Sequence, residues 1–265
     1  MRRTMGKISV GCQTITWGEY RWGHLEETLA GVSQAGYDGV EIGARFLDLD
    51  EPDIFQELLR RYNLTLAGLH FGVRWYDPQA VDEAKPQLTK IVDFLVALGC
   101  GDLIVSGGER KEGMEPDDYR RQAEALDEVG RHCRERGVKL HYHNHGWEVR
   151  NDCEGLRRIC ELSDPKNVSL ALDLGNVVIP GGGNPEEVVR EFSDRIGYLH
   201  LKDVRGDEFV PVGRGEIDFP TIFSILGEKR FKGWIVVENE VELGEMTPVE
   251  CIGISRKYLK DALGL

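Results

Sequence analysis

Residues 24–42 read HLEETLAGVSQAGYDGVEI and contain both elements of the unit from which this chain is built. Leu25, Leu29 and Val32 recur at helical spacing, which predicts an amphipathic helix. Gly36 follows this helix, and glycine suits the left-handed position just after a helix end. The short apolar run after Gly36 is typical of a buried strand, so the stretch predicts a helix that leads directly into a strand.

The same alternation of short apolar runs and longer amphipathic stretches continues to the carboxyl end. Strands are expected near Ile8–Cys12, Gly39–Ile42, Thr65–His70, Asp102–Ser106, Lys139–His143, Ser169–Asp173, Ile196–Leu201 and Trp234–Glu238. Helices are expected over 24–35, 51–62, 79–98, 116–136, 152–162, 184–194, 218–228 and 247–263. This order indicates a (β/α)8 TIM barrel, an α/β fold, formed as a single domain over residues 1–265. An open doubly wound sheet is the alternative, but it usually carries GxGxxG after its first strand, whereas residues 11–18 read GCQTITWG.

The composition excludes several classes of function. The 265 residues are 41% hydrophobic and carry a formal net charge of −13. This charge repels nucleic-acid phosphates and anionic membrane surfaces, so neither is expected as a partner. The six cysteines form no CxxC pair, which is typical of reduced thiols. With no recognisable secretory signal or membrane-spanning run, a cytoplasmic location is expected.

Polar residues end or closely follow several of the expected strands. In a (β/α)8 barrel the carboxyl ends of the strands and the loops after them form the active site. Asp173 closes SLALD, His200 closes IGYLH and Glu238 closes WIVVE. The fifth strand runs into HYHNHGWE at 141–148, whose three alternating histidines share one face if the strand continues that far. Carboxylates and imidazoles without thiolates predict a site for Mn²⁺, Mg²⁺, Co²⁺ or Zn²⁺.

Four ordered segments carry a resemblance to a known family. They are HYHNHGWE (141–148), LALDLGN (170–176), YLHLKDVRGDEFVPVGRGEIDF (198–219) and GWIVVENE (233–240). Together they resemble the xylose-isomerase-like TIM-barrel superfamily of sugar phosphate isomerases and epimerases, especially its inosose dehydratase branch. The resemblance covers most of the chain and implies one divalent metal ion, with manganese as the first expectation. It also implies a small sugar or polyol substrate and a homo-oligomer, either a dimer or a tetramer.

The resemblance implies metal ligands after the fifth, sixth, seventh and eighth strands. Carried onto this sequence, the ligands are Glu148, Asp173, His200 and Glu238. Relatives usually place the first glutamate directly at the end of the fifth strand, whereas Glu148 comes several residues later, so His143 and His145 are alternatives. Metal-bound epimerases of this kind also often carry a histidine three residues after the aspartate, where this chain has Asn176.

The implied chemistry is abstraction of a proton alpha to the carbonyl of a keto-polyol or keto-sugar, leading to dehydration, isomerisation or epimerisation. Glu148, Glu238 or His145 would act as the base, and Lys202 would donate to a substrate oxygen. Further candidates for substrate binding are His70, His143, Asn176, Trp17, Glu41 and Arg214. The three histidines in HYHNH exceed what one metal needs, so one or two of them are free to bind substrate hydroxyls or move protons. His141, earliest in the strand, is expected to be a buried group that is structural or supports a metal ligand.

Three other functions are considered. A β-eliminating 3-keto-glycoside lyase shares enolate formation, and Trp17, Trp22, Trp75 and Trp147 would be available to stack on a sugar or aglycone. An apurinic-endonuclease-type phosphodiesterase shares the barrel, but it needs a cluster of metals and a basic groove, which the acidic composition disfavours. The third alternative is a sugar-binding protein without catalytic activity.

Overall fold

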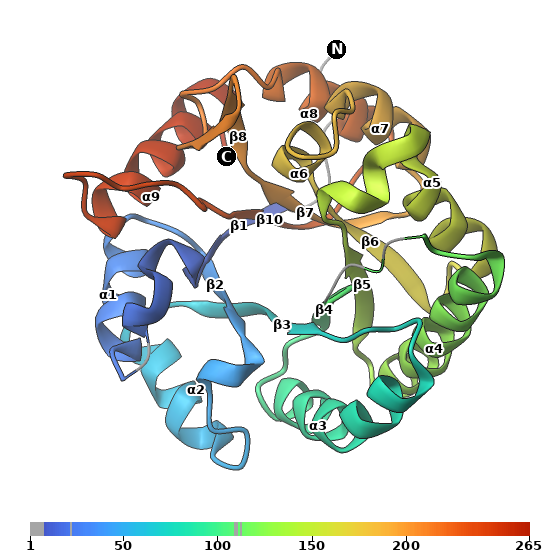
Figure 1. Ribbon diagram of the computed structural model, residues 1–265. Coiled ribbons are helices and arrows are strands. Elements are labelled where there is room, and N and C mark those ends of the chain that lie inside the picture. The colour runs from blue at the N-terminus through green and yellow to red at the C-terminus, as the bar shows by residue number, and fades with distance from the viewer. Residues whose placement is uncertain (1–7, 22, 109–110, 112) are drawn as a thin grey trace.

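Parallel strands form a closed barrel in this protein. The computed structural model describes residues 8–21, 23–108, 111 and 113–265, so Trp22 lies outside the described residues. The strands follow the order β1-β10-β7-β6-β5-β4-β3-β2 around the ring, and the helices surround them (Figure 1). Their bounds are β1 Ile8–Gln13, β2 Gly39–Gly43, β3 Thr65–Gly72, β4 Asp102–Ser106, β5 Lys139–His143, β6 Val168–Asp173, β7 Ile196–Leu201 and β10 Gly233–Val237. Pairing of β1 with β10 closes the ring, which confirms the predicted TIM barrel and excludes the open sheet.

The helices correspond to the predicted ones with a few additions. They are α1 Leu25–Gln34, α2 Pro52–Arg61, α3 Pro78–Ala97, α4 Pro116–Glu135, α5 Gly146–Leu162, α6 Leu174–Val178, α7 Pro185–Phe192, α8 Phe219–Glu228 and α9 Pro248–Tyr258, with the shorter turns η1 Thr14–Arg21, η2 Ala44–Phe46 and η3 Leu259–Leu263. The sequence did not predict α6 or the small hairpin of β8 (Asp203–Arg205) and β9 (Glu208–Val210). Both lie in loops that follow barrel strands, where little hydrophobic periodicity guides prediction.

Local sequence signals explain where the helices begin and end. Gly36 has a φ of 85°, the left-handed conformation expected after α1. Asn184 caps α7, because its side chain accepts hydrogen bonds from the backbone N–H groups of Glu186 and Glu187. The predicted helix 152–162 starts earlier, at Gly146, and contains a left-handed turn at residues 151–153. The chain therefore leaves the sheet immediately after His143, before it reaches His145.

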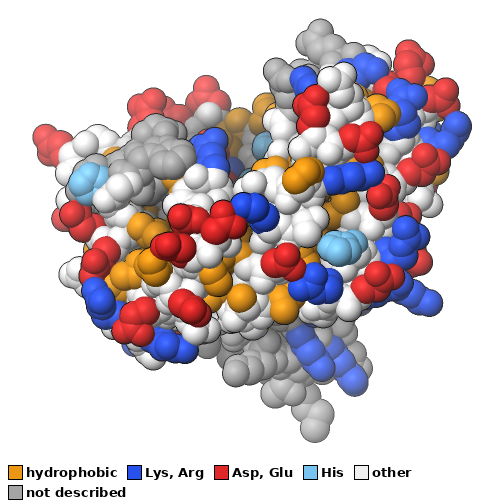
Figure 2. All heavy atoms as spheres, turned by 90° about the horizontal axis from the view of Figure 1, so that it is seen from below, with side chains coloured by type: hydrophobic (Ala, Val, Ile, Leu, Met, Phe, Trp, Pro, Cys, Tyr) orange, Lys and Arg blue, Asp and Glu red, His pale blue; other side chains and the backbone are white. Residues whose placement is uncertain are grey.

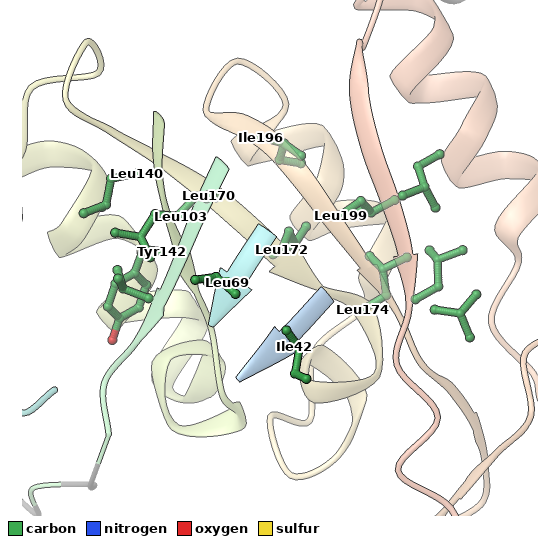
Figure 3. Close-up of a cluster of buried hydrophobic side chains, with 14 of the residues drawn as sticks. Ile42, Leu69, Leu103, Leu140, Tyr142, Leu170, Leu172, Leu174, Ile196 and Leu199 are labelled. Atoms are coloured by element: carbon green, nitrogen blue, oxygen red, sulfur yellow. The ribbon is translucent and has the colours of Figure 1, made fainter. Parts of the chain in front are cut away.

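The barrel has one hydrophobic layer outside the strands and another inside. Leu170 and Leu172 of β6 belong to the outer layer between strands and helices (Figure 3). Ala171 belongs instead to the interior cluster, which consists of Ala67, Ile104, Ala171, Tyr198 and Val236. Because side chains alternate along a strand, Asp173 faces the same side as Ala171, one step nearer the carboxyl end. The interior cluster therefore forms an apolar floor beneath the polar groups at that end.

The outer surface carries charges of both signs. Figure 2 shows acidic and basic side chains interspersed over one face of the molecule. Several are paired, for example Arg157 with Glu191 at 2.6 Å and Lys90 with Asp50 at 2.7 Å. Among the described residues, none of the helices is long and apolar enough to cross a membrane.

Candidate metal centre

Four side chains of kinds that can ligate a metal, named here the metal-ligating group, meet at the carboxyl-terminal mouth of the barrel. His143 ends β5, Asp173 ends β6, His200 lies near the end of β7 and Glu238 directly follows β10. Parallel strands bring these ends to the same side of the barrel. Each residue offers one ligand atom, and these atoms all lie within 4.8 Å of one another. All four side chains are buried, which is typical of a metal site and not of a solvated acidic patch.

The hydrogen-bonding state of this group fits a cation. Among the residues that the structure describes, His143 Nε2, Asp173 Oδ2, His200 Nδ1 and Glu238 Oε2 are buried and make no hydrogen bond of ordinary geometry, although they lie close to one another. His143 Nε2 lies 3.4 Å from Asp173 Oδ2 and 3.6 Å from Glu238 Oε2, while His200 Nδ1 lies 2.7 Å from Glu238 Oε2. Buried polar atoms are almost always satisfied, so unpartnered atoms that converge in this way require an explanation. Two imidazoles and two carboxylates form a donor set suited to a divalent transition metal.

Lys202 lies beside both carboxylates of this group. Its Nζ is 3.1 Å from Glu238 Oε1, 3.4 Å from Asp173 Oδ2 and 2.9 Å from Glu240 Oε2. Burial lowers the pKa of Lys202, but the charges of Asp173 and Glu238 outweigh this and raise it. Burial likewise raises the pKa of Glu238, but Lys202 and His200 hold it well below its usual range. Lys202 therefore stays an ammonium ion and Glu238 a carboxylate.

Glu41 of β2 orients His200 of β7, although β1 and β10 separate these two strands around the ring. Glu41 Oε2 lies 2.6 Å from His200 Nε2, and both side chains are fully buried. This hydrogen bond leaves Nδ1 as the nitrogen that faces Glu238 and His143. The sequence suggested Glu41 as a substrate-binding residue, but its hydrogen bond is one that typically positions a metal-bound histidine.

We expect Glu41→Gln to weaken binding of Mn²⁺ about tenfold, because second-sphere carboxylates typically contribute ~10–100-fold to metal affinity. The measurement is isothermal titration calorimetry of metal-depleted protein, which requires no substrate. Glu57→Gln, an exposed change on α2, is the matched control. Unaltered affinity in Glu41→Gln would show that the Glu41 hydrogen bond does not organise the centre.

Two further histidines face the metal-ligating group as neutral imidazoles. The rings of His70 and His145 each lie 5.3 Å from the ring of His143. Burial lowers the pKa of His70 to about 4 and that of His145 to about 3. His70 Nε2 and His145 Nδ1 are buried and have no hydrogen-bond partner in the part of the chain that the structure describes. Both can therefore exchange hydrogen bonds with the hydroxyl groups of a bound molecule.

Glu148, the expected first ligand, lies outside the metal-ligating group. Its Oε1 accepts a hydrogen bond of 2.7 Å from Tyr142, and its Oε2 accepts one of 2.8 Å from the backbone N–H of His145. The second bond is part of the cap at the start of α5. His143, which the sequence left as an alternative, is the residue of β5 that joins the group. The spacing H-x-x-E at 145–148 was a visible signal for this cap.

Burial makes Glu148 a weaker acid than an ordinary glutamate. It raises the pKa of Glu148 from 4.5 to about 7, against hydrogen bonds from Tyr142 and His145 that lower it. Since the pKa is higher in the folded protein, protonation of Glu148 stabilises the fold at pH values below about 4.5. That contribution is lost as the pH rises through about 7.

We expect the stability of the wild-type protein, relative to Glu148→Gln, to fall by roughly 3 kcal/mol between these pH limits. The measurement is urea unfolding of both proteins, without metal, at several pH values from 4.5 to 8. Glu242→Gln, an exposed substitution, should show no such trend. A pH-independent difference between wild type and Glu148→Gln would contradict the expected burial effect.

The remaining candidate residues have other surroundings. Asn176 lies in α6, where its backbone N–H donates to Asp173 Oδ1 at 2.7 Å and its side chain donates to the carbonyl of Asn144. Trp17 is buried in the hydrophobic core, and Arg214 is exposed in the loop after β9, so the structure places neither in the metal-ligating group. His141 is fully buried between Asp102 and Ser169, which fits the structural role expected for it.

Asn144 is a contributor that the sequence reasoning missed. Its Oδ1 accepts a hydrogen bond of 2.8 Å from the backbone N–H of Asp173, and its Nδ2 donates to the Asp173 carbonyl at 3.2 Å. Asn144 thereby fastens the residue after β5 to the end of β6. Its place between two histidines in HYHNH was the only sequence signal for this contact.

Comparisons with known proteins agree with this architecture. The family model described as "Xylose isomerase-like TIM barrel" matches residues 29–261. An inosose dehydratase of Geobacillus kaustophilus is 28% identical over 300 residues, covering 98% of this chain and 96% of the relative. A crystal structure of a sugar phosphate isomerase/epimerase from Parabacteroides distasonis superposes with a TM-score of 0.80 at 22% identity, covering 99% and 96% of the two chains.

A second solved structure contains a sugar. The D-allulose 3-epimerase of a Methylomonas species, in complex with D-allulose, superposes with a TM-score of 0.71 at 23% identity and covers 100% of this chain and 98% of its own. At this identity the superposition establishes the fold alone. The extent of the family match, together with the closed barrel and its strand order, shows that this chain belongs to the xylose isomerase-like TIM barrel family.

Proposed function

We propose that this protein is a divalent-metal-dependent enzyme that abstracts a proton alpha to the carbonyl of a keto-polyol or keto-sugar. The observation that carries the proposal is the buried group of His143, Asp173, His200 and Glu238 with its converging unpartnered atoms. The similarity to an inosose dehydratase over nearly the whole chain supports a sugar or polyol as the substrate class. Dehydration, isomerisation and epimerisation share this first step.

The four residues would hold one cation, with Mn²⁺ as the first choice and Mg²⁺, Co²⁺ or Zn²⁺ as alternatives. When bound there, the cation would polarise the substrate carbonyl and stabilise the negative charge of the enediolate. The ligands are buried, so little water is present to screen their charges. The interaction of the cation with the developing negative charge would therefore be stronger than in water.

The protein's own side chains would carry the proton and orient the substrate. Glu238, kept ionised by Lys202 and His200, would accept the proton as the carbon–hydrogen bond breaks and its electron pair forms the enediolate. The Lys202 ammonium, held between carboxylates, would donate a hydrogen bond to an enediolate oxygen. His70 and His145 would bind hydroxyl groups. In dehydration, His145 would face the hydroxyl that departs as water.

The test is exchange of carbon-bound hydrogen in deuterated water, followed by NMR, with a keto-inositol and a panel of ketohexoses. Exchange should occur with at least one substrate when Mn²⁺ is present, stop after exhaustive chelation, and return when Mn²⁺ is restored. Full exchange in chelated protein would refute the metal-dependent mechanism. Binding of a sugar without exchange of any carbon-bound hydrogen would instead indicate a sugar-binding protein.

A further inference from the structure

A second cavity lies beside the metal-ligating group at the carboxyl-terminal face of the barrel. Its volume is about 450 Å³, and it lies between the loops after β3 and β4, the helix α4 and the start of α5. The residues of its wall that matter here are Trp75, Gly107, Gln122, Tyr142, Trp147 and Glu148. Among the described lining residues, none belongs to the metal-ligating group. The cavity is therefore a separate space with an aromatic and polar lining.

Three polar atoms converge at one point of this wall, beside Gly107. A methyl group placed on Gly107 would lie 3.0 Å from Tyr142 Oη, 3.2 Å from Glu148 Oε1 and 3.8 Å from Trp147 Nε1. A larger residue at position 107 would therefore crowd these atoms. Glycine is therefore the residue that fits beside these three atoms.

A chain of hydrogen bonds fixes the donors and acceptors at this point. Gln122 Nε2 donates to Tyr142 Oη at 3.0 Å, and Tyr142 Oη donates to Glu148 Oε1 at 2.7 Å. Trp147 Nε1–H has no acceptor among the residues that the structure describes. An acceptor oxygen on Glu148 beside a free donor on Trp147 matches a hydroxyl group, which both donates and accepts.

The charges around the cavity favour a neutral ligand. The buried carboxyl group of Glu148 opposes an anion. Two cationic side chains also line the cavity, but both have partners: Lys111 pairs with Asp118 at 2.5 Å, and Arg150 donates to the carbonyl of Pro180 at 3.2 Å. Aromatic faces combined with hydroxyl-binding atoms are typical of sites for neutral sugar rings.

Two stacked rings connect this cavity to the metal-ligating group. The Trp147 ring is stacked on the His145 ring with centroids 4.2 Å apart and an interplanar angle of 16°. The His145 ring in turn meets the His143 ring edge-on at 5.3 Å. The His145 ring therefore stands between the Trp147 ring, which lines the cavity, and the metal-ligating group.

We propose that the cavity beside Gly107 is a second sugar-ring subsite, so that the substrate is a neutral glycoside with its keto ring at the metal-ligating group and its other ring in this cavity. Trp147 Nε1 and Glu148 Oε1 bind a hydroxyl of the second ring, and the neighbouring aromatic side chains contact its faces. This inference rests on the proposed function for the location of the keto ring, but binding in the cavity does not depend on the metal.

The test uses phenyl β-D-glucopyranoside, which lacks the keto group, and metal-depleted protein. Binding is measured by isothermal titration calorimetry and saturation-transfer NMR. Trp147→Phe keeps the ring on His145 but removes the N–H donor, and it should weaken binding about fivefold, the usual effect of one lost hydrogen bond. Trp234→Phe, at the amino end of β10, is the matched control and should bind as the wild type does. Gly107→Val, which fills the space beside Glu148, should weaken binding at least ~10-fold.

The outcomes separate this inference from the proposed function. Glucoside binding that is equal in wild type and in both cavity variants overturns the subsite. Absence of glucoside binding in a protein that still exchanges hydrogen in a keto-inositol also overturns it, and leaves the proposed function intact. Glucoside binding that depends on Trp147, in a protein without any metal-dependent exchange, supports the subsite and refutes the proposed function.

Discussion

Replacement of Asp173 by asparagine should lower the metal-dependent kcat/KM on the order of 1000-fold, beyond the ~10–100-fold typical of second-sphere changes. The Asp173 carboxylate is fully buried, and its Oδ2 lies 3.4 Å from both His143 Nε2 and Lys202 Nζ. An amide cannot supply the negative charge that a cation needs there. The substitution should preserve the local fold, because the amide oxygen can still accept the 2.7 Å hydrogen bond from the backbone of Asn176.

Two measurements check the Asp173→Asn prediction. Calorimetric titration with Mn²⁺ reports the metal affinity, and hydrogen exchange in deuterated water reports the reaction. Asp207→Asn, in the exposed turn between β8 and β9, is the control and should change neither. If Asp173→Asn bound Mn²⁺ as tightly as the wild type, the carboxylate would not be a ligand and the assignment of the centre would fail.

The second large effect is expected at Lys202. Its ammonium group and a metal ion would both be attracted by Asp173 and Glu238. In metal-free protein, Lys202→Met leaves these buried carboxylates without their cation, which should cost roughly 3–5 kcal/mol of unfolding free energy. With Mn²⁺ present the cation compensates, so we expect tighter metal binding, recovered stability, and a kcat about 100-fold below that of the wild type because a donor to the enediolate is lost.

Urea unfolding with and without Mn²⁺, together with calorimetry, measures the Lys202 effects. Lys232→Met is the control, because Lys232 is exposed just before β10. Destabilisation of Lys202→Met that Mn²⁺ does not relieve would mean that cation and ammonium do not share the same carboxylates. Unchanged kcat would remove Lys202 from the proposed mechanism.

The sequence predicted most of the ligand group because strand ends are readable. Asp173, His200 and Glu238 each close a short apolar run. In a closed parallel barrel the carboxyl ends of all strands lie at the same face, so these residues come together independently of the loop conformations. The alternation along β6 also determines that Asp173 faces inward. The convergence of these three residues was predictable because both inferences use the period of a strand and require no knowledge of loops.

The fifth strand shows where prediction from sequence ended. The sequence does not state whether HYHNHGWE continues as a strand or turns after His143. The turn is made by Asn144, which binds the backbone of Asp173 at the end of the neighbouring strand β6, and by Glu148, which caps α5. The Asn144 contact joins residues 29 positions apart, which become neighbours only after folding, whereas the Glu148 contact lies within one turn of α5. The choice between His143 and Glu148 therefore depended on tertiary structure.

The order of strands around the ring has a consequence for biosynthesis. Glu238 follows β10, and β10 occupies the place between β7 and β1, so its position depends on pairing with the amino-terminal strand. A nascent chain on the ribosome presents His143, Asp173 and His200 before Glu238 has been translated. A cation that bound the complete centre would therefore be taken up late, after β1 and β10 have paired, and it would stabilise that pairing.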